Sequence, residues 1–137
     1  MQSESKMSAD LDNAKYVSFT SYKKDGTAVS IPVWVVPFEG GYAFTTDPGA
    51  FKVKRVRRDA RVSLAVCSFK GKVSPDAVTY NGAAVILEGE DGNRVARAIQ
   101  KKYRIGYTLI TLQSRLNRLR GKESHAAETA IKVMLSE

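Results

Sequence analysis

The sequence predicts a mainly β domain of the α+β type, in which about six antiparallel strands close into a small barrel that carries helices. Residues 16–88 fall largely into short segments rich in β-branched and aromatic residues, which are typical of strands. Glycine-containing turn signals separate several of these segments. A mostly antiparallel sheet of this size tends to close on itself, because closure removes exposed strand edges.

The first three strands are expected over residues 16–22, 28–36 and 42–46. In the first, Val17 and Phe19 alternate with polar residues, as in a strand with one buried face. Lys24-Asp-Gly26 predicts a hairpin turn, because Asp-Gly readily adopts positive φ angles. The apolar run over residues 33–36 indicates burial on both faces, and Glu39-Gly-Gly41 predicts a second turn. These three strands are therefore expected to form a meander.

A turn over residues 47–50 and a short helix over residues 51–58 follow the third strand, with Val53 and Val56 turned inward. Three further strands are expected over residues 61–69, 78–88 and 129–135, and Asn81-Gly82 predicts a bulge in the middle one. Two helices are predicted between the strands expected over residues 78–88 and 129–135. The first begins near residues 91–93, and the second carries leucines at helical spacing from residue 109 to 119 and ends at Gly121.

The chain's 137 residues suit one domain, and 43% hydrophobic composition is enough for a core. Residues 1–13 are expected to be a flexible N-terminal tail and residues 14–137 a single domain, with a short helix over residues 11–15 that Asp10 would cap. No apolar run approaches the roughly 20 residues of a membrane span, and the polar N-terminus lacks a signal-peptide core. We therefore expect no stable membrane insertion.

The single cysteine and single histidine limit the disulfides, metal sites and catalytic triads that the chain can form. Cys67 is the only cysteine, so no intrachain disulfide is possible and a cytoplasmic location is expected. His125 is the only histidine, so a zinc site or a Ser-His-Asp triad would depend on that one residue. No metal site is predicted.

The formal net charge is +8, and residues 94–122 contain nine Lys and Arg residues and no Asp or Glu. Such a field attracts nucleic acid, an anionic membrane surface or a polyanionic small molecule. Nucleic-acid binders usually interleave exposed aromatic residues with basic ones. Here most aromatic residues lie in apolar strands, so the sequence argues against a nucleic-acid partner.

Residues 43–59 form the most informative segment. A strand ends in Thr45 and Thr46, a Pro-Gly turn follows, and the next helix carries five cations: Lys52, Lys54, Arg55, Arg57 and Arg58. Backbone N–H groups and cations gathered at a helix start can receive an anion, and Lys52 and Arg55 are spaced to reach the same one. The simpler interpretation is a solvated surface helix, and these residues alone leave both open. No catalytic motif accompanies them, which is typical of enzymes that rely on a cofactor.

Two segments resemble a known family. Residues 16–36 resemble the opening of the pyridoxamine 5′-phosphate oxidase-like split β-barrel superfamily. Lys52-Val-Lys-Arg-Val-Arg-Arg-Asp-Ala-Arg-Val62 resembles the Lys-x-x-Arg…Arg-Asn-Pro-Arg-Val segment of its deazaflavin-dependent branch, and the likeness extends over residues 14–135. The resemblance implies a six-stranded antiparallel split β-barrel, with a short helix after strand 3 and C-terminal helices. It also implies an interlocked homodimer with cofactor sites at the subunit interface.

The same resemblance implies the site residues. The position matching Lys52 contacts the cofactor phosphate in relatives, and Lys54 and Arg55 lie nearby. The strand matching Pro32, Val33, Trp34 and Val35 lies along the ring system, while Thr45 and Thr46 line the path from ring to phosphate. The chain departs from the pattern at Ala60, where relatives often have proline, and at Phe51, where they have a small or basic residue. A phenylalanine there would reshape the phosphate pocket or pack on a ring.

The cofactor implied is the deazaflavin coenzyme F420, with FMN as the alternative. F420 carries a phosphate and an oligoglutamate tail, which suits the basic run over residues 94–122. The implied reaction is hydride transfer between C5 of the deazaflavin and a small unsaturated organic substrate, with the protein orienting the ring and excluding water. Tyr22, Tyr80 and Tyr103 are candidate proton donors, and the sequence singles out none of them. A cofactor-binding protein without turnover is a further alternative.

Overall fold

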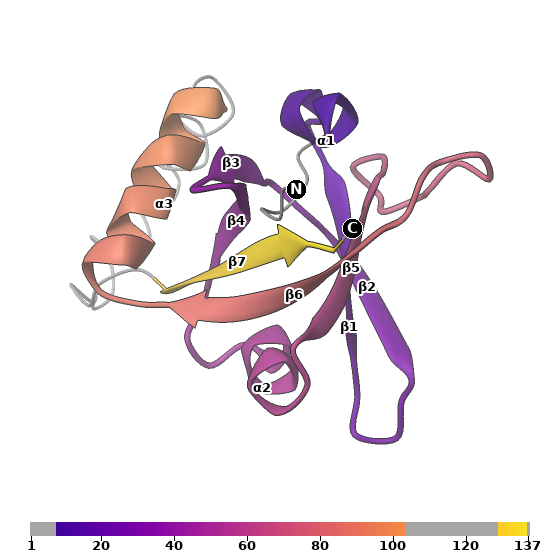
Figure 1. Cartoon of the computed structure of the whole chain (residues 1–137), viewed down its shortest axis with the longest axis horizontal. Helices are drawn as coiled ribbons and strands as arrows, with labels where there is room; N and C mark the ends of the chain where they lie inside the picture. Colours follow the sequence, from indigo (N-terminus) through magenta and orange to yellow (C-terminus); the bar gives the residue numbers. More distant parts are fainter. Residues whose placement is uncertain (1–7, 104–128, 137) are drawn as a thin grey trace, which may run out of the picture.

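The computed structural model describes residues 8–103 and 129–136. In chain order the elements are α1 (Ala9–Asn13), β1 (Val17–Tyr22), β2 (Ala28–Val33), β3 (Val36–Phe38), β4 (Gly41–Thr46), α2 (Phe51–Arg58), β5 (Arg61–Val66), β6 (Tyr80–Leu87), α3 (Glu90–Lys102) and β7 (Thr129–Leu135). The mainly β class is confirmed, as are the short helix after the first hairpins and the last strand (Figure 1).

All strands join one seven-stranded sheet in the order β2-β1-β5-β6-β7-β4-β3, and every neighbouring pair is antiparallel. The end strands β2 and β3 are consecutive in the chain, and only Trp34 and Val35 separate them. Three Cα steps span at most about 11 Å, so the two ends of the sheet must meet at this corner. The sheet therefore curls round on itself as a small barrel does.

The prediction of a single second strand over residues 28–36 is wrong, because the chain leaves the sheet at Trp34 and Val35. The indole of Trp34 stacks on Tyr103, with 4.6 Å between ring centroids. The Val35 carbonyl accepts hydrogen bonds from the Tyr103 hydroxyl and from Lys102 Nζ, both at 2.9 Å, in place of a strand partner. Residues 33–36 are also not buried on both faces throughout, since Val33 and Trp34 are half-buried. The sheet therefore has seven strands, one more than predicted.

The predicted meander is also wrong, although both of its turns are present. Gly26 and Gly40 adopt positive φ angles of 89° and 83° at the two hairpin turns. The two hairpins do not pair with each other, because β1 pairs with β5 and β4 pairs with β7. Long-range pairing thus places the hairpins at opposite ends of the strand order.

The predicted bulge at Asn81-Gly82 is absent. Ser63, Val62 and Arg61 pair in turn with Asn81, Gly82 and Ala83, without an extra residue. The glycine serves a close approach instead, since a Cβ on Gly82 would lie 2.5 Å from the carbonyl oxygen of Met134. β7 could not approach a larger residue so closely without shifting.

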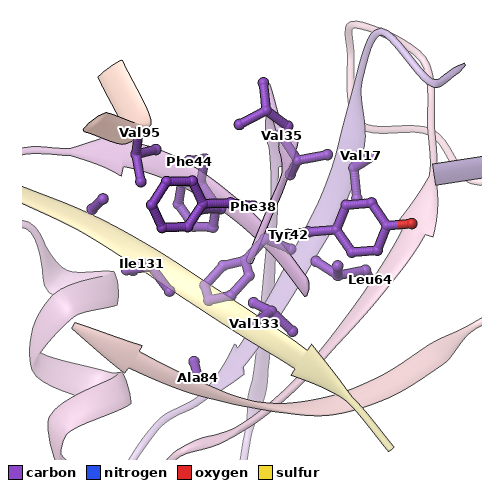
Figure 2. Packing of buried hydrophobic residues seen from close by; sticks show 14 of the residues in the cluster. Val17, Val35, Phe38, Tyr42, Phe44, Leu64, Ala84, Val95, Ile131 and Val133 are labelled. Carbon is purple, nitrogen blue, oxygen red and sulfur yellow. The ribbon is translucent and has the colours of Figure 1, made fainter. Parts of the chain in front are cut away.

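The core lies inside the curl of the sheet. Figure 2 shows side chains from β1, β4, β7 and α3 meeting there, among them Val17, Phe44, Ile131 and Val95. Each of these four is at most 1% exposed. α3 contacts β3, β4 and β7, while α2 contacts β1 and β6 and buries Val53 and Val56 as predicted (Figure 1). The start of α2 is thereby anchored to the core.

The helix expected over residues 11–15 begins earlier, at Ala9, and Ser8 rather than Asp10 caps it. Leu11 is fully buried, and the Tyr42 hydroxyl donates to Asp12 Oδ1 at 2.5 Å. The residues from Ser8 onward are therefore docked, although the sequence placed them in a flexible tail. The second predicted helix, near residues 109–121, lies outside the described residues. Among those described, no helix is long and apolar enough to cross a membrane.

Candidate functional site

The predicted anion-binding segment begins where β4 ends and turns into α2. Thr45 and Thr46 pair with Ala130 and Thr129 of β7, so the sheet holds both threonines in place. The turn closes with a 3.1 Å hydrogen bond from the Ala50 N–H to the Asp47 carbonyl. Ala50 is the N-cap of α2 and supplies no side-chain acceptor. The first N–H groups of α2 are therefore available to an anion at this end of the helix.

Thr46 carries an unusual polar atom for a folded protein. Its Oγ1 is buried, and it has no hydrogen-bond partner among the described residues. A buried hydroxyl without a partner costs about 1–3 kcal/mol, so most buried hydroxyls in proteins are paired. An external group that bonds to this hydroxyl would recover that free energy.

Lys52, on the first turn of α2, is half-buried, and its ammonium has no hydrogen bond or ion pair with a described residue. Burial lowers the pKa of its ammonium, Asp47 raises that pKa, and the nearby charge of Arg55 lowers it again. A bound anion would stabilise the charged ammonium that burial disfavours. Thr46 and Lys52 thus flank the same turn, and neither side chain has a hydrogen-bond partner among the described residues.

The other two predicted cations of α2, Arg55 and Lys54, have contacts of their own. Arg55 donates from Nε to the Ser21 hydroxyl at 2.8 Å, and Ser21 is fully buried, so this guanidinium is tied to β1. Lys54 is exposed and lies 5.5 Å from the ring centroid of Phe51. The structure therefore brings Lys52 and Arg55 into electrostatic range of each other but directs Lys54 to the outer surface of the helix.

The four residues predicted to lie along a cofactor ring, Pro32 to Val35, differ in how far their side chains are buried. Pro32 is exposed on β2, and Val33 and Trp34 are half-buried, so these three side chains are accessible. The Val35 side chain is fully buried in the core, and its carbonyl oxygen already accepts two hydrogen bonds. Val35 therefore supports the corner, and among these four residues only Pro32, Val33 and Trp34 have accessible side chains.

Sequence reasoning missed two side chains that make long-range contacts in this region, Ser21 and Lys102, and it named Phe51 without predicting the exposure of its ring. Ser21 contacts Arg55, which lies 34 positions further along the chain, and Lys102 contacts Val35, which lies 67 positions before it. No local sequence pattern reveals contacts over such separations. Tyr103 was named from the sequence as a candidate proton donor, and its hydroxyl bond to the Val35 carbonyl was not foreseen.

A curled antiparallel sheet, with a basic turn and helix after β4, defines a small β-barrel protein that carries a candidate anion site. The chain belongs to the pyridoxamine 5′-phosphate oxidase family, whose sequence model matches residues 3–133. No curated protein sequence matches the chain significantly.

Solved structures share this fold. A protein from Listeria innocua, provisionally assigned as a pyridoxamine 5′-phosphate oxidase, has a TM-score of 0.62 at 19% identity, with 94% of this chain and 90% of that chain covered. The heme storage protein HutZ from Vibrio cholerae has a TM-score of 0.63 at 12% identity, with coverages of 93% and 85%. An F420 reductase has a TM-score of 0.59 at 15% identity, with coverages of 93% and 90%. At these identities the likeness shows the common fold.

Proposed function

We propose that the protein is a deazaflavin-dependent oxidoreductase, which transfers a hydride between bound coenzyme F420 and a small unsaturated organic substrate. The observation that carries the proposal is that Thr46 and Lys52 flank the same turn, since a buried hydroxyl without a partner among the described residues and a half-buried ammonium suit a phosphate. The F420 reductase among the structural relatives is consistent with this choice. The heme storage protein shows that the fold alone does not select the cofactor.

The residues present fit the phosphate end of such a cofactor. Lys52 would neutralise the phosphate, Thr46 Oγ1 would donate a hydrogen bond to it, and the first N–H groups of α2 would complete the set. The bound deazaflavin supplies the hydride at C5. Pro32, Val33 and Trp34 would orient the ring system and exclude water from it, because these side chains are apolar and accessible.

FMN remains the alternative, because one phosphate site serves either cofactor. The basic run over residues 94–122 supports F420 less than its sequence suggests, since three of its four described cations already have partners. Arg94 Nη2 lies 2.7 Å from Glu39 Oε2, and Arg97 Nη2 lies 3.0 Å from Glu90 Oε2. Lys102 donates to the Val35 carbonyl. The preference for F420 therefore rests on the resemblance of residues 52–62 to the deazaflavin-dependent branch.

The test is titration of the purified protein with F420, FMN and hemin, followed by fluorescence or absorbance. We expect quenching of F420 fluorescence at micromolar concentrations and weaker binding of the other two. Lys52→Ala should weaken F420 binding by tenfold or more, since a hydrogen bond to a charged group contributes about 1.5–3 kcal/mol. Arg57→Ala is the matched control, because Arg57 lies on the same helix and pairs with Glu88 at 3.2 Å. Tight FMN binding without F420 quenching, or equal effects of the two variants, would contradict the assignment.

The same proposal includes turnover and a homodimer with cofactor sites at the subunit interface. The homodimer rests on the family resemblance, and Val85 of β6, which is 51% exposed on the outer surface of the sheet, is the side chain that we place in its interface. Reoxidation of the reduced complex by a panel of unsaturated acceptors would test turnover. A complex that binds F420 but reduces no acceptor would instead support a binding protein without catalysis.

A further inference from the structure

The loop between β5 and β6, residues 67–79, extends away from the rest of the sheet (Figure 1). Five large apolar side chains are exposed in the described parts of the chain, and three of them lie in this loop: Phe69, Val73 and Val78. Single exposed apolar side chains are normal at protein surfaces, but several on one projecting loop indicate a contact surface. No residue of the loop is among those assigned to the cofactor.

The tip of the loop is held in one conformation by Ser68. The Ser68 hydroxyl oxygen accepts the N–H groups of Lys70 at 3.2 Å and Lys72 at 3.1 Å. The Ser68 N–H donates to the Lys72 carbonyl at 3.0 Å, and the Gly71 N–H donates to the Ser68 carbonyl at 2.8 Å. Gly71 has a φ angle of 87°, which glycine adopts without strain. The tip is therefore a closed turn, and the side chains of residues 69, 70 and 72 are exposed on it.

Two aromatic rings and three lysines meet at this tip. The ring of Phe69 is 64% exposed, and Lys70 Nζ lies 5.8 Å from its centroid. The half-buried ring of Tyr16 lies 6.4 Å from that of Phe69, and Lys15 Nζ lies 5.8 Å from the Tyr16 centroid. We call these residues and Lys72 the loop-tip surface, which contains three cations and no carboxylate.

The one acidic residue of the loop is directed elsewhere. Asp76 accepts a hydrogen bond from the Ser74 hydroxyl. It lines a cavity of about 520 Å³ between the end of the loop and α1, together with Ala9 and Asn13 of that helix. The loop-tip surface therefore keeps its positive charge, which the formal net charge of +8 reinforces.

This combination of side chains matches an anionic phospholipid surface. Aromatic rings favour the headgroup layer of a bilayer, and lysines are attracted to anionic headgroups. The methylene chain of a lysine can follow apolar surface while its ammonium stays at the lipid phosphates. A soluble polyanion would use the three cations but leave Phe69 in water. The same surface of a second copy would bring like charges together.

We propose that the loop-tip surface docks the protein reversibly on anionic phospholipid membranes. Phe69 would enter the headgroup layer, and Lys15, Lys70 and Lys72 would contact the lipid phosphates. One inserted ring and a few lysines give a weak, peripheral attachment, so the expectation of no stable membrane insertion is unchanged. The proposal uses none of the cofactor residues and does not rest on the deazaflavin assignment.

The experiment is flotation of the full chain with vesicles of phosphatidylcholine alone or mixed equally with phosphatidylglycerol. The protein should float with the mixed vesicles only. Phe69→Ala should lower the partition onto mixed vesicles by about tenfold, because a buried phenylalanine ring loses its apolar contact. Phe51→Ala is the matched control, since it removes a phenylalanine that is 73% exposed beside the cations of α2 and should change the partition little.

The charge contribution needs its own control, because any basic surface of the chain attracts anionic vesicles. Lys70→Gln with Lys72→Gln should lower the partition by about fivefold for each lysine. Lys23→Gln with Lys24→Gln makes the same change in net charge at the exposed β1–β2 turn and should have a much smaller effect. Charges further from the bilayer than the Debye length, about 10 Å at 0.1 M salt, are largely screened.

Insertion of the ring has a direct readout that does not depend on loss of binding. Phe69→Trp and Phe51→Trp both keep Trp34, which is the only tryptophan of the chain. On mixed vesicles the emission of Phe69→Trp should shift to the blue and should be quenched by brominated lipid. The emission of Phe51→Trp should do neither.

Three results would overturn the proposal: no flotation with mixed vesicles, equal loss of binding in Phe69→Ala and Phe51→Ala, or unchanged emission of Phe69→Trp on vesicles. Self-association without lipid that Phe69→Ala abolishes would assign the surface to a contact between copies, and would also overturn it. None of these measurements includes F420, so this proposal and the deazaflavin assignment can fail separately.

Discussion

The indole of Trp34 lies nearly parallel to the ring of Tyr103, with 4.6 Å between their centroids and 8° between their planes. This stack joins the corner between β2 and β3 to the end of α3. The Tyr103 hydroxyl donates a hydrogen bond to the Val35 carbonyl at 2.9 Å. Burial raises the pKa of that hydroxyl to about 12. One side chain therefore holds the corner where the two ends of the sheet meet.

Tyr103→Phe should lower the free energy of unfolding by about 1–2 kcal/mol, because it removes the buried hydroxyl that contacts the Val35 and Ala14 carbonyls, while Lys102 still donates to the Val35 carbonyl. Tyr103→Leu should cost about 0.5–1.5 kcal/mol more, since it also removes the aromatic stack. Urea denaturation followed by Trp34 fluorescence would measure both variants. Equal stability of the Phe and Leu variants would show that the stack contributes nothing.

The elements that the sequence predicted well are those with local signals. Asp25-Gly26 determines a hairpin turn within four residues, and the apolar spacing of Val53 and Val56 determines the buried face of α2. The strand order could not be predicted in this way, because β4 pairs with β7 across more than 80 residues of sequence. The break at Trp34 likewise depends on Tyr103, a residue that no local pattern connects to it.

The candidate site likewise has features that a local sequence pattern predicts and features that only the structure shows. Lys52 was found from a turn followed by a basic helix, which is a local pattern. The lack of a partner for the Thr46 hydroxyl depends on what packs around it, so only the structure shows it. The exposure of Phe51 could have been anticipated from its helical spacing, since it lies on the side of α2 opposite Val53 and Val56.

Leu11→Ala should destabilise the protein by about 2–5 kcal/mol, because Leu11 is fully buried beneath the sheet although it lies close to the N-terminus. Val78→Ala is the control, since Val78 is 54% exposed and should change stability by less than about 0.5 kcal/mol. Chemical denaturation would compare the two. A small effect of Leu11→Ala would restore the expectation of a flexible tail up to residue 13.

Asp59→Asn should remove part of the acid sensitivity of the fold. Asp59 ends α2 and accepts hydrogen bonds from the Arg61 guanidinium at 2.7 and 3.0 Å, which lower its pKa to about 2. A carboxylate with a lowered pKa in the folded state stabilises it above about pH 4, and this contribution disappears as the pH falls toward 2.

Thermal unfolding between pH 2 and 5 would therefore give a shallower fall in Tm for Asp59→Asn than for the wild type. Arg61→Gln should flatten the curve in the same direction, because the carboxylate loses the same bonds. Parallel curves for all three proteins would mean that other groups control the acid transition.

Val85→Glu should dissociate the proposed dimer. Val85 lies opposite Lys132 on the outer surface of β6 and β7 and is 51% exposed in the single chain. A buried interface would make a new carboxylate costly there. Sedimentation equilibrium should give twice the chain mass of 15.1 kDa for the wild type and for Val73→Glu, a loop control, and the chain mass for Val85→Glu. A wild-type species of 15.1 kDa would refute the dimer.

Thr46→Val should stabilise the protein without cofactor and weaken cofactor binding. The substitution replaces a buried hydroxyl that has no partner among the described residues with a methyl group of similar size, which should raise the free energy of unfolding by up to about 1–3 kcal/mol. The lost hydrogen bond should lower F420 affinity by roughly two- to tenfold. Thr46→Ser keeps the hydroxyl and should restore the affinity. Stability and affinity that fall together would indicate that Thr46 supports the fold and does not contact the phosphate.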